Sequence, residues 1–159
     1  MIRLASRSLS AGIFMSRILA SSLTLLVLAS VCACASPPPD LDVALTHASV
    51  DRKFIVVLRP PATPAAINQM HSWQIELTTP TGTPIAGAHF AVDGGMPQHG
   101  HGLPTQPRVT RELADGTYLL EGMKFSMTGW WEIRLAIDSA AGSDKVTFNT
   151  VVGVPPAVH

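Results

Sequence analysis

The sequence predicts an all-β fold, an immunoglobulin-like antiparallel β-sandwich of about seven strands that follows an N-terminal signal segment. Apolar and polar residues alternate clearly over 71–79 and 130–138, and this period of two is typical of a strand with one wet face. Turn residues recur at close spacing between the apolar runs. No stretch beyond the signal shows a convincing helical period, so short strands joined by turns favour a sandwich.

Residues 1–34 are predicted to be an export signal. Three arginines, Arg3, Arg7 and Arg17, precede an apolar run over 18–33. That run is shorter than the ~20 apolar residues of a spanning helix, and it fits a secretory signal. A compact signal also begins at Met15, so Met1 and Met15 are both candidate start residues.

The end of this signal resembles a bacterial lipobox, Val31-Cys32-Ala33-Cys34. We therefore expect a lipoprotein-type signal peptide over 1–34, with Cys34 lipidated and the chain anchored on the periplasmic side of the cell envelope. Ser36 is not the Asp that retains lipoproteins at the inner membrane, which favours the outer membrane. Ordinary cleavage near Ala35, giving a soluble periplasmic or secreted protein, and a retained anchor helix are the alternatives.

Composition limits what the exported part can do. We predict a Pro-rich tether over 35–50 and a β-sandwich domain over 51–159. The 11 Asp and Glu residues all follow the signal, whereas 3 of the 11 Lys and Arg residues lie within it, which leaves a net charge of −3. This balance excludes the basic surface that nucleic acid requires. Both cysteines lie in the signal, so the domain contains neither a disulfide nor a reactive thiol.

Apolar patterning places the strands in chain order. The first is a heavily covered strand over 54–58, and the next two, 71–79 and 85–92, are predicted to pair as a hairpin around the turn at 80–84. A short strand over 108–112 and one from Thr117 through Leu120 or beyond follow, and 130–138 pairs with the residues around Val146 and Phe148 in a final hairpin. The stretch 41–50 is either linker or a marginal first strand. Asp115-Gly116-Thr117-Tyr118 resembles a tyrosine corner, in which a buried hydroxyl bonds nearby backbone.

The candidate functional site is the loop over 94–107, which concentrates His, Met, Gly and Pro. Met96, His99 and His101 supply one thioether and two imidazoles, and this donor set suits copper because soft sulfur selects Cu(I) and imidazole serves both oxidation states. Gly100 permits backbone angles that bring both rings to one centre. Gly94 and Gly95 are expected to act as hinges, and Pro97 and Pro104 to stiffen the edges of the loop. Alternatively, the loop is a tight crossover, its histidines are solvated, and Met96 plugs the end of the core.

Three further residues are possible ligands: His71, Met123 and Met127. His71 shares the apolar face of Trp73 and is expected to be a core-edge histidine more often than a ligand. Methionine is usually core filler. His47, His89 and His159 are weaker candidates. Of the adjacent tryptophans, Trp131 continues the apolar face and is expected in the core. Trp130 is either an exposed contact or is covered by the loop, where its ring would adjoin a Cu(I) centre.

Several spaced motifs are similar to those of YtkA-like and FixH-like domains. They are His71-Ser72-Trp73, the run Met96–Thr105, Pro107–Thr110, Gly116-Thr117-Tyr118 and Phe125–Trp131. The resemblance implies a small exported or membrane-anchored β-sandwich. The FixH branch is associated with assembly of a copper-containing cbb3 oxidase, so it also implies copper handling. The lipobox-like signal differs from the transmembrane anchor of FixH.

Two functions follow from these observations. In the first, an exported, lipid-anchored sandwich binds or handles copper in the cell envelope through Met96, His99 and His101. In the second, the loop contacts an envelope protein partner and holds no metal. An enzyme is not expected, because no Ser/His/Asp, Cys/His or paired-carboxylate arrangement has a recognisable context.

Overall fold

The computed structural model describes residues 37–63 and 66–153, and within them it forms two antiparallel sheets. The five-stranded sheet has the order β1-β2-β3-β7-β6, and its strands are β1 (Thr46–Ala48), β2 (Ile55–Arg59), β3 (His71–Thr78), β7 (Thr117–Met123) and β6 (Arg108–Ala114). The four-stranded sheet has the order β5-β4-β8-β9, and its strands are β5 (His101–Gly102), β4 (His89–Met96), β8 (Gly129–Ser139) and β9 (Gly142–Val152).

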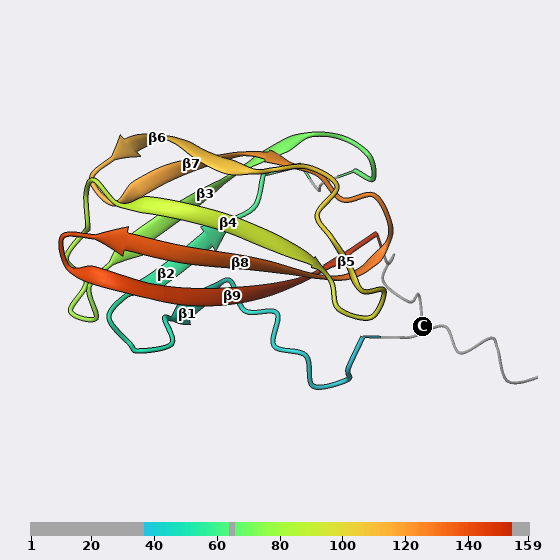
Figure 1. Cartoon of the computed structure of the whole chain (residues 1–159), viewed down its shortest axis with the longest axis horizontal. Coiled ribbons are helices and arrows are strands. Elements are labelled where there is room, and N and C mark those ends of the chain that lie inside the picture. The colour runs from blue at the N-terminus through green and yellow to red at the C-terminus, as the bar shows by residue number, and fades with distance from the viewer. Residues whose placement is uncertain (1–36, 64–65, 154–159) are drawn as a thin grey trace, which may run out of the picture. The chain divides into compact units, whose positions relative to one another are not determined.

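The two sheets face each other as a sandwich, as the sequence predicts (Figure 1). Their inner faces share one apolar core that includes Ile75, Leu77, Leu120, Ile133, Leu135 and Phe148. The two strands beyond the expected seven are the shortest ones, β1 and β5. Over residues 37–63 and 66–153, no helix is long and apolar enough to span a bilayer. The predicted signal and Cys34 lie outside the described residues.

The predicted hairpin between 71–79 and 85–92 is wrong. β3 pairs with β2 and β7 in one sheet, whereas β4 pairs with β5 and β8 in the other. The turn itself forms, since the Thr79 N–H donates to the Thr83 carbonyl at 2.8 Å. The pairing ends soon after an isolated bridge between Thr78 and Pro84 and a bond from the Ile85 N–H to the Leu77 carbonyl at 3.0 Å. The chain then crosses between the sheets, with Ile85 and Ala88 buried in the core. β4 therefore starts at His89 and continues to Met96, inside the expected loop.

Two side chains hold this crossover. The Tyr118 hydroxyl donates to the Ile85 carbonyl at 2.6 Å and accepts from the Ala88 N–H at 3.0 Å. The Glu112 carboxylate accepts from the Gly87 N–H at 2.9 Å and from the Gly116 N–H at 3.0 Å. The predicted tyrosine corner is thus correct in that the hydroxyl bonds backbone, but its partners lie about thirty residues upstream and across the sandwich.

The stretch predicted as tether is partly ordered into the fold. β1 lies within 35–50 and pairs with β2, so the marginal first strand exists. The following loop is fixed by Asp144, whose carboxylate accepts from the Asp51 N–H at 3.1 Å and the Lys53 N–H at 3.4 Å. Burial alone would raise the pKa of Asp144, but hydrogen bonds from Ser49 and from backbone N–H groups outweigh it and lower the pKa to about 2.

Replacing Tyr118 with Phe tests the crossover clamp. The change leaves the Ala88 N–H and the Ile85 carbonyl without their partner in a buried region, so we expect the free energy of unfolding to fall by about 1–3 kcal/mol. Urea unfolding measures the loss. Thr110→Val is the control, because it removes an exposed hydroxyl that bonds Glu121 and should change stability by less than about 0.5 kcal/mol. Equal effects of the two changes would contradict the clamp.

Candidate functional site

The end of the sandwich that carries the predicted loop is shaped by two adjacent glycines in β4. A Cβ atom on Gly94 would lie 2.3 Å from the Glu132 carbonyl oxygen, and one on Gly95 would lie 2.3 Å from the His101 carbonyl oxygen. No side chain fits at these distances, so the glycines let β4 approach both of its neighbours. They were expected to act as hinges, but they lie within a paired strand.

A tight turn then joins β4 to β5. The N–H groups of His99 and Gly100 both donate to the Met96 carbonyl, at 3.1 and 3.0 Å. Gly100 has a φ of 67°, a left-handed angle that glycine adopts without strain. The turn returns the chain so that His101 lies directly opposite Met96 in the β4–β5 register.

This register brings the three primary candidate donors together. Directly opposed residues of an antiparallel pair present their side chains on the same face of the sheet, so Met96 and His101 are cross-strand neighbours. Met96 is 1% exposed, whereas the two histidines are exposed. The rings of His99 and His101 stack with 5.8 Å between centroids and 28° between planes. A buried methionine and an exposed histidine therefore share one face of this strand pair, and a second exposed imidazole stacks on the first.

Met127 belongs to the same end of the molecule. It lies two residues before β8, its side chain is 42% exposed, and its carbonyl accepts a hydrogen bond from the Trp131 indole at 3.1 Å. A Cβ atom on Gly129 would lie 3.0 Å from the Met96 methyl carbon, so the start of β8 packs against the Met96 side chain. The structure thus gathers Met96, His99, His101 and the Met127 backbone around the start of β8.

The other two candidate ligands form a separate group. His71 and Met123 are partners in the β3–β7 register, and Met123 is fully buried. Phe125 stands between the two groups, with its ring centroid 5.1 Å from that of His71 and 5.2 Å from that of Trp131.

The hydrogen bonding of His71 favours the core-edge interpretation. The Trp73 indole N–H donates to His71 Nδ1 at 2.7 Å, so the neutral ring carries its proton on Nε2. That atom is buried and has no hydrogen-bond partner. Burial also lowers the pKa of His71. Neither ring nitrogen offers a free lone pair in this arrangement.

The remaining histidines lie apart from the loop. The His47 ring packs edge-on against Phe148 with 5.0 Å between centroids, and His89 is exposed at the start of β4, as predicted. His159 lies outside the described residues. Within residues 37–63 and 66–153, no three His, Cys, Asp or Glu side chains gather as metal ligands. A metal site at the loop would therefore depend on thioether sulfur.

Sequence reasoning missed the ring that borders the loop. The His101 ring lies 6.0 Å from the Trp131 ring, at 64° between planes. The adjacent Trp130 points to the opposite face, where its indole N–H donates to Asn149 Oδ1 at 2.9 Å. The parity of β8 correctly placed Trp131 in the core, but only the β4–β5 register brings His101 over it.

Below pH 6.5 the stability of the fold should fall because of His71. Its pKa is lowered in the folded state, so the unfolded chain binds the proton more tightly and acid favours unfolding. The contribution of neutral His71 to the free energy of unfolding is complete above about pH 6.5. It is lost as the pH falls toward the pKa of His71 in the folded protein. The measurement is the free energy of unfolding in urea between pH 7.5 and 5.5. His71→Phe should flatten this dependence, and an unchanged slope in that variant would contradict the role of His71.

The chain is similar to a known protein family and, weakly, to a solved structure. A family model described as YtkA-like matches residues 49–136. No curated protein matches the chain. Among solved structures, the ZirS C-terminal domain aligns with a TM-score of 0.38 and 10% sequence identity, covering 94% of this chain and 83% of that chain. A likeness at this level says nothing about function.

Proposed function

The chain belongs to the YtkA-like family, and we propose that it is an exported, lipid-anchored β-sandwich that binds copper as cargo in the cell envelope. One observation carries the proposal. The β4–β5 register sets Met96 directly opposite His101, so both side chains lie on one face of the sheet, and the His99 ring stacks on the His101 ring.

The donor chemistry favours copper over other common metals. Thioether sulfur suits Cu(I), and imidazole suits both Cu(I) and Cu(II). Structural zinc is usually held by four Cys or His ligands, and calcium by six or more oxygens. The described residues bring no three His, Cys, Asp or Glu side chains together, so neither ion finds its usual ligands. Two exposed imidazoles over one buried thioether support binding that is open to exchange.

A second candidate function also has an observation in its favour. Met127 and Val151 are 42% and 40% exposed, and both lie near the start of β8, since Val151 pairs with Trp130. Exposed apolar side chains beside a shaped loop suit a docking surface for another envelope protein. In this alternative the loop contacts a partner and holds no metal.

Metal titration of the two-histidine variant separates these functions. The protein is purified from the envelope of expressing cells and titrated with Cu(I), in competition with a chromophoric chelator, and separately with Cu(II). We expect His99→Ala/His101→Ala to raise the dissociation constant for Cu(I) by about tenfold or more, because two of three donors are lost. A tenfold change corresponds to about 1.4 kcal/mol of binding free energy. His89→Ala is the matched control, since it removes an exposed histidine at the other end of β4. Equal Cu(I) affinity in all three proteins would exclude the copper site.

The proposed anchor is tested through Cys34, whose acyl chains would hold the protein on the envelope membrane. Cys34→Ala removes the acceptor of the lipid, so the protein should move from the membrane pellet to the soluble fraction of fractionated cells. Wild-type protein should also incorporate radiolabelled fatty acid, and the variant should not. A variant that stays in the membrane pellet, with no label in either protein, would support a retained anchor helix instead.

A further inference from the structure

The indole of Trp131 is in ring contact with His101. Trp131 is fully buried, and the centroids of the two rings lie 6.0 Å apart with 64° between their planes. The indole N–H donates to the Met127 carbonyl at 3.1 Å, and the Phe125 ring packs against it at 5.2 Å. The ring is therefore held in one orientation by contacts on several sides.

The candidate thioether approaches the same place. Met96 lies opposite His101 across the β4–β5 ladder, and its methyl group packs against Gly129, two residues before Trp131. Exposed Met127 is tied to the indole through its own carbonyl. The Trp131 indole thus borders the ring of one primary donor, His101, and lies two residues along β8 from the glycine that packs against the other, Met96.

An aromatic ring beside the donors has a chemical consequence for the choice of metal. The face of an indole attracts a cation but offers no lone pair and no site for bound water. A soft monovalent ion with few ligands tolerates such a neighbour. A divalent ion that needs further oxygen or nitrogen ligands loses hydration there without replacement.

We propose that Trp131 is the specificity-determining residue of this site, whose indole borders the bound ion and makes the site prefer Cu(I) and other soft monovalent ions over Zn(II) and Cu(II). This inference rests on the proposed copper function. The aromatic neighbour of the metal is then Trp131, and not the outward-facing Trp130.

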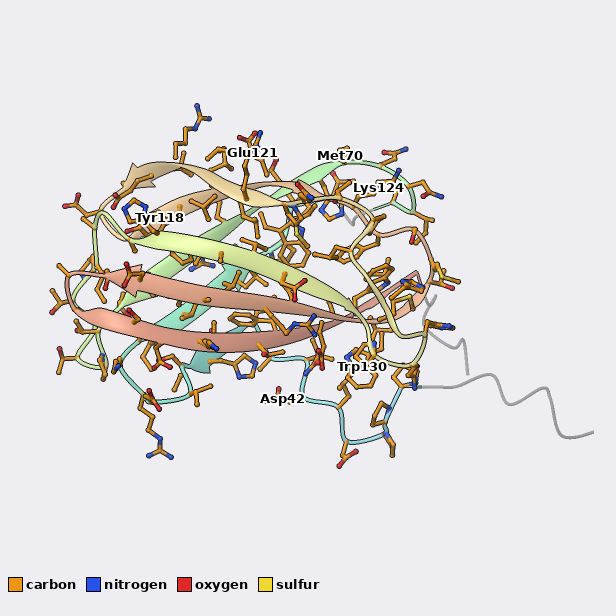
Figure 2. All side chains as sticks on the ribbon, in the orientation of Figure 1. Asp42, Met70, Tyr118, Glu121, Lys124 and Trp130 are labelled. Carbon is orange, nitrogen blue, oxygen red and sulfur yellow. The ribbon has the colours of Figure 1, made fainter. Side chains whose placement is uncertain are left out.

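The neighbouring tryptophan supplies a matched control. Trp130 lies at the same end of the sandwich (Figure 2), but its indole N–H is bonded to Asn149 on the outer face of the sheet. The third tryptophan, Trp73, is buried beside His71, with Phe125 between it and Trp131. The three rings therefore report on three different positions.

Silver titration followed by fluorine NMR tests the assignment. Ag(I) replaces Cu(I) as a soft monovalent ion that does not change oxidation state. Wild-type protein labelled with 5-fluorotryptophan should give three resonances, one for each tryptophan. The Trp130 resonance is the one that disappears in Trp130→Phe. The other two are distinguished with Trp73→Phe or Trp131→Phe, whichever variant folds. We expect Ag(I) to shift the Trp131 resonance most and to leave the Trp130 resonance in place. A largest shift at Trp130 or Trp73 would overturn the inference.

Selectivity supplies the second readout. Trp131→Leu removes the aromatic face and should reduce the preference for Ag(I) over Zn(II) by about three- to thirty-fold, the range of a cation–π contact, whereas Trp130→Leu should leave it unchanged. If wild-type protein binds neither Ag(I) nor Cu(I), the proposed function itself fails. If it binds both through the two histidines, but the Trp131 resonance does not move, only the assignment of Trp131 fails.

Discussion

The close approach of β4 to its two neighbours is the constraint on which the end of the sandwich depends. At Gly94 and Gly95 the backbones of β8 and β5 come so near that a Cβ atom would meet a carbonyl oxygen at 2.3 Å. Because the strand passes between them, Met96 turns inward and His101 returns opposite it. The geometry of the donors is therefore set by backbone contact, before any ligand is considered.

This arrangement needs a scaffold that keeps the two sheets in position without a covalent link. Both cysteines precede residue 35, so no disulfide joins the sheets. Polar side chains take that role at the crossings: Tyr118 and Glu112 bond the backbone between β3 and β4, and Asp144 bonds the loop before β2. The Tyr118 bonds are buried, where an unpaired backbone group would be costly, whereas the Asp144 bond is partly buried and the Glu112 bond to Gly87 is exposed. Figure 2 places Tyr118 far from Trp130, so the scaffold is held at the end away from the candidate site.

Local patterning predicted the strands well because each strand buries one face. The alternation around Trp73 and Trp131 identified β3 and β8, and both tryptophans are in the core as expected. Pairing between strands was less predictable. A short turn such as 80–84 suits a hairpin, but whether the chain pairs or crosses depends on distant partners, here Tyr118 and Glu112.

The candidate site shows the same limit. Met96, His99 and His101 were identified from donor chemistry, and the structure brings them together. The separation of His71 and Met123 from them depends on Phe125, which enters from another strand connection. The hydrogen bond from the Trp73 indole to His71 Nδ1 joins residues two apart on one face of β3. The His-x-Trp spacing in the sequence could therefore have predicted that this histidine is engaged by its neighbour. The expectation that Gly94 and Gly95 are hinges was wrong, because glycine occurs both in flexible segments and where two backbones approach closely, and here the second case holds.

The distribution of burial around the donors bears on what kind of copper protein this would be. A site that retains its metal encloses the ion, and neighbouring groups orient its ligands by hydrogen bonds. Here the thioether is buried, but the imidazoles are exposed, and Met127, two residues before β8, is also exposed. An incoming protein with its own sulfur or imidazole donors would meet the ion from the histidine side, while Met96 and the indole of Trp131 hold the other side. Exchange between proteins requires such a one-sided site, because ligands must be replaced one at a time without releasing the ion to water. The exposed apolar side chains of Met127 and Val151 would then lie where a protein that receives the ion could dock.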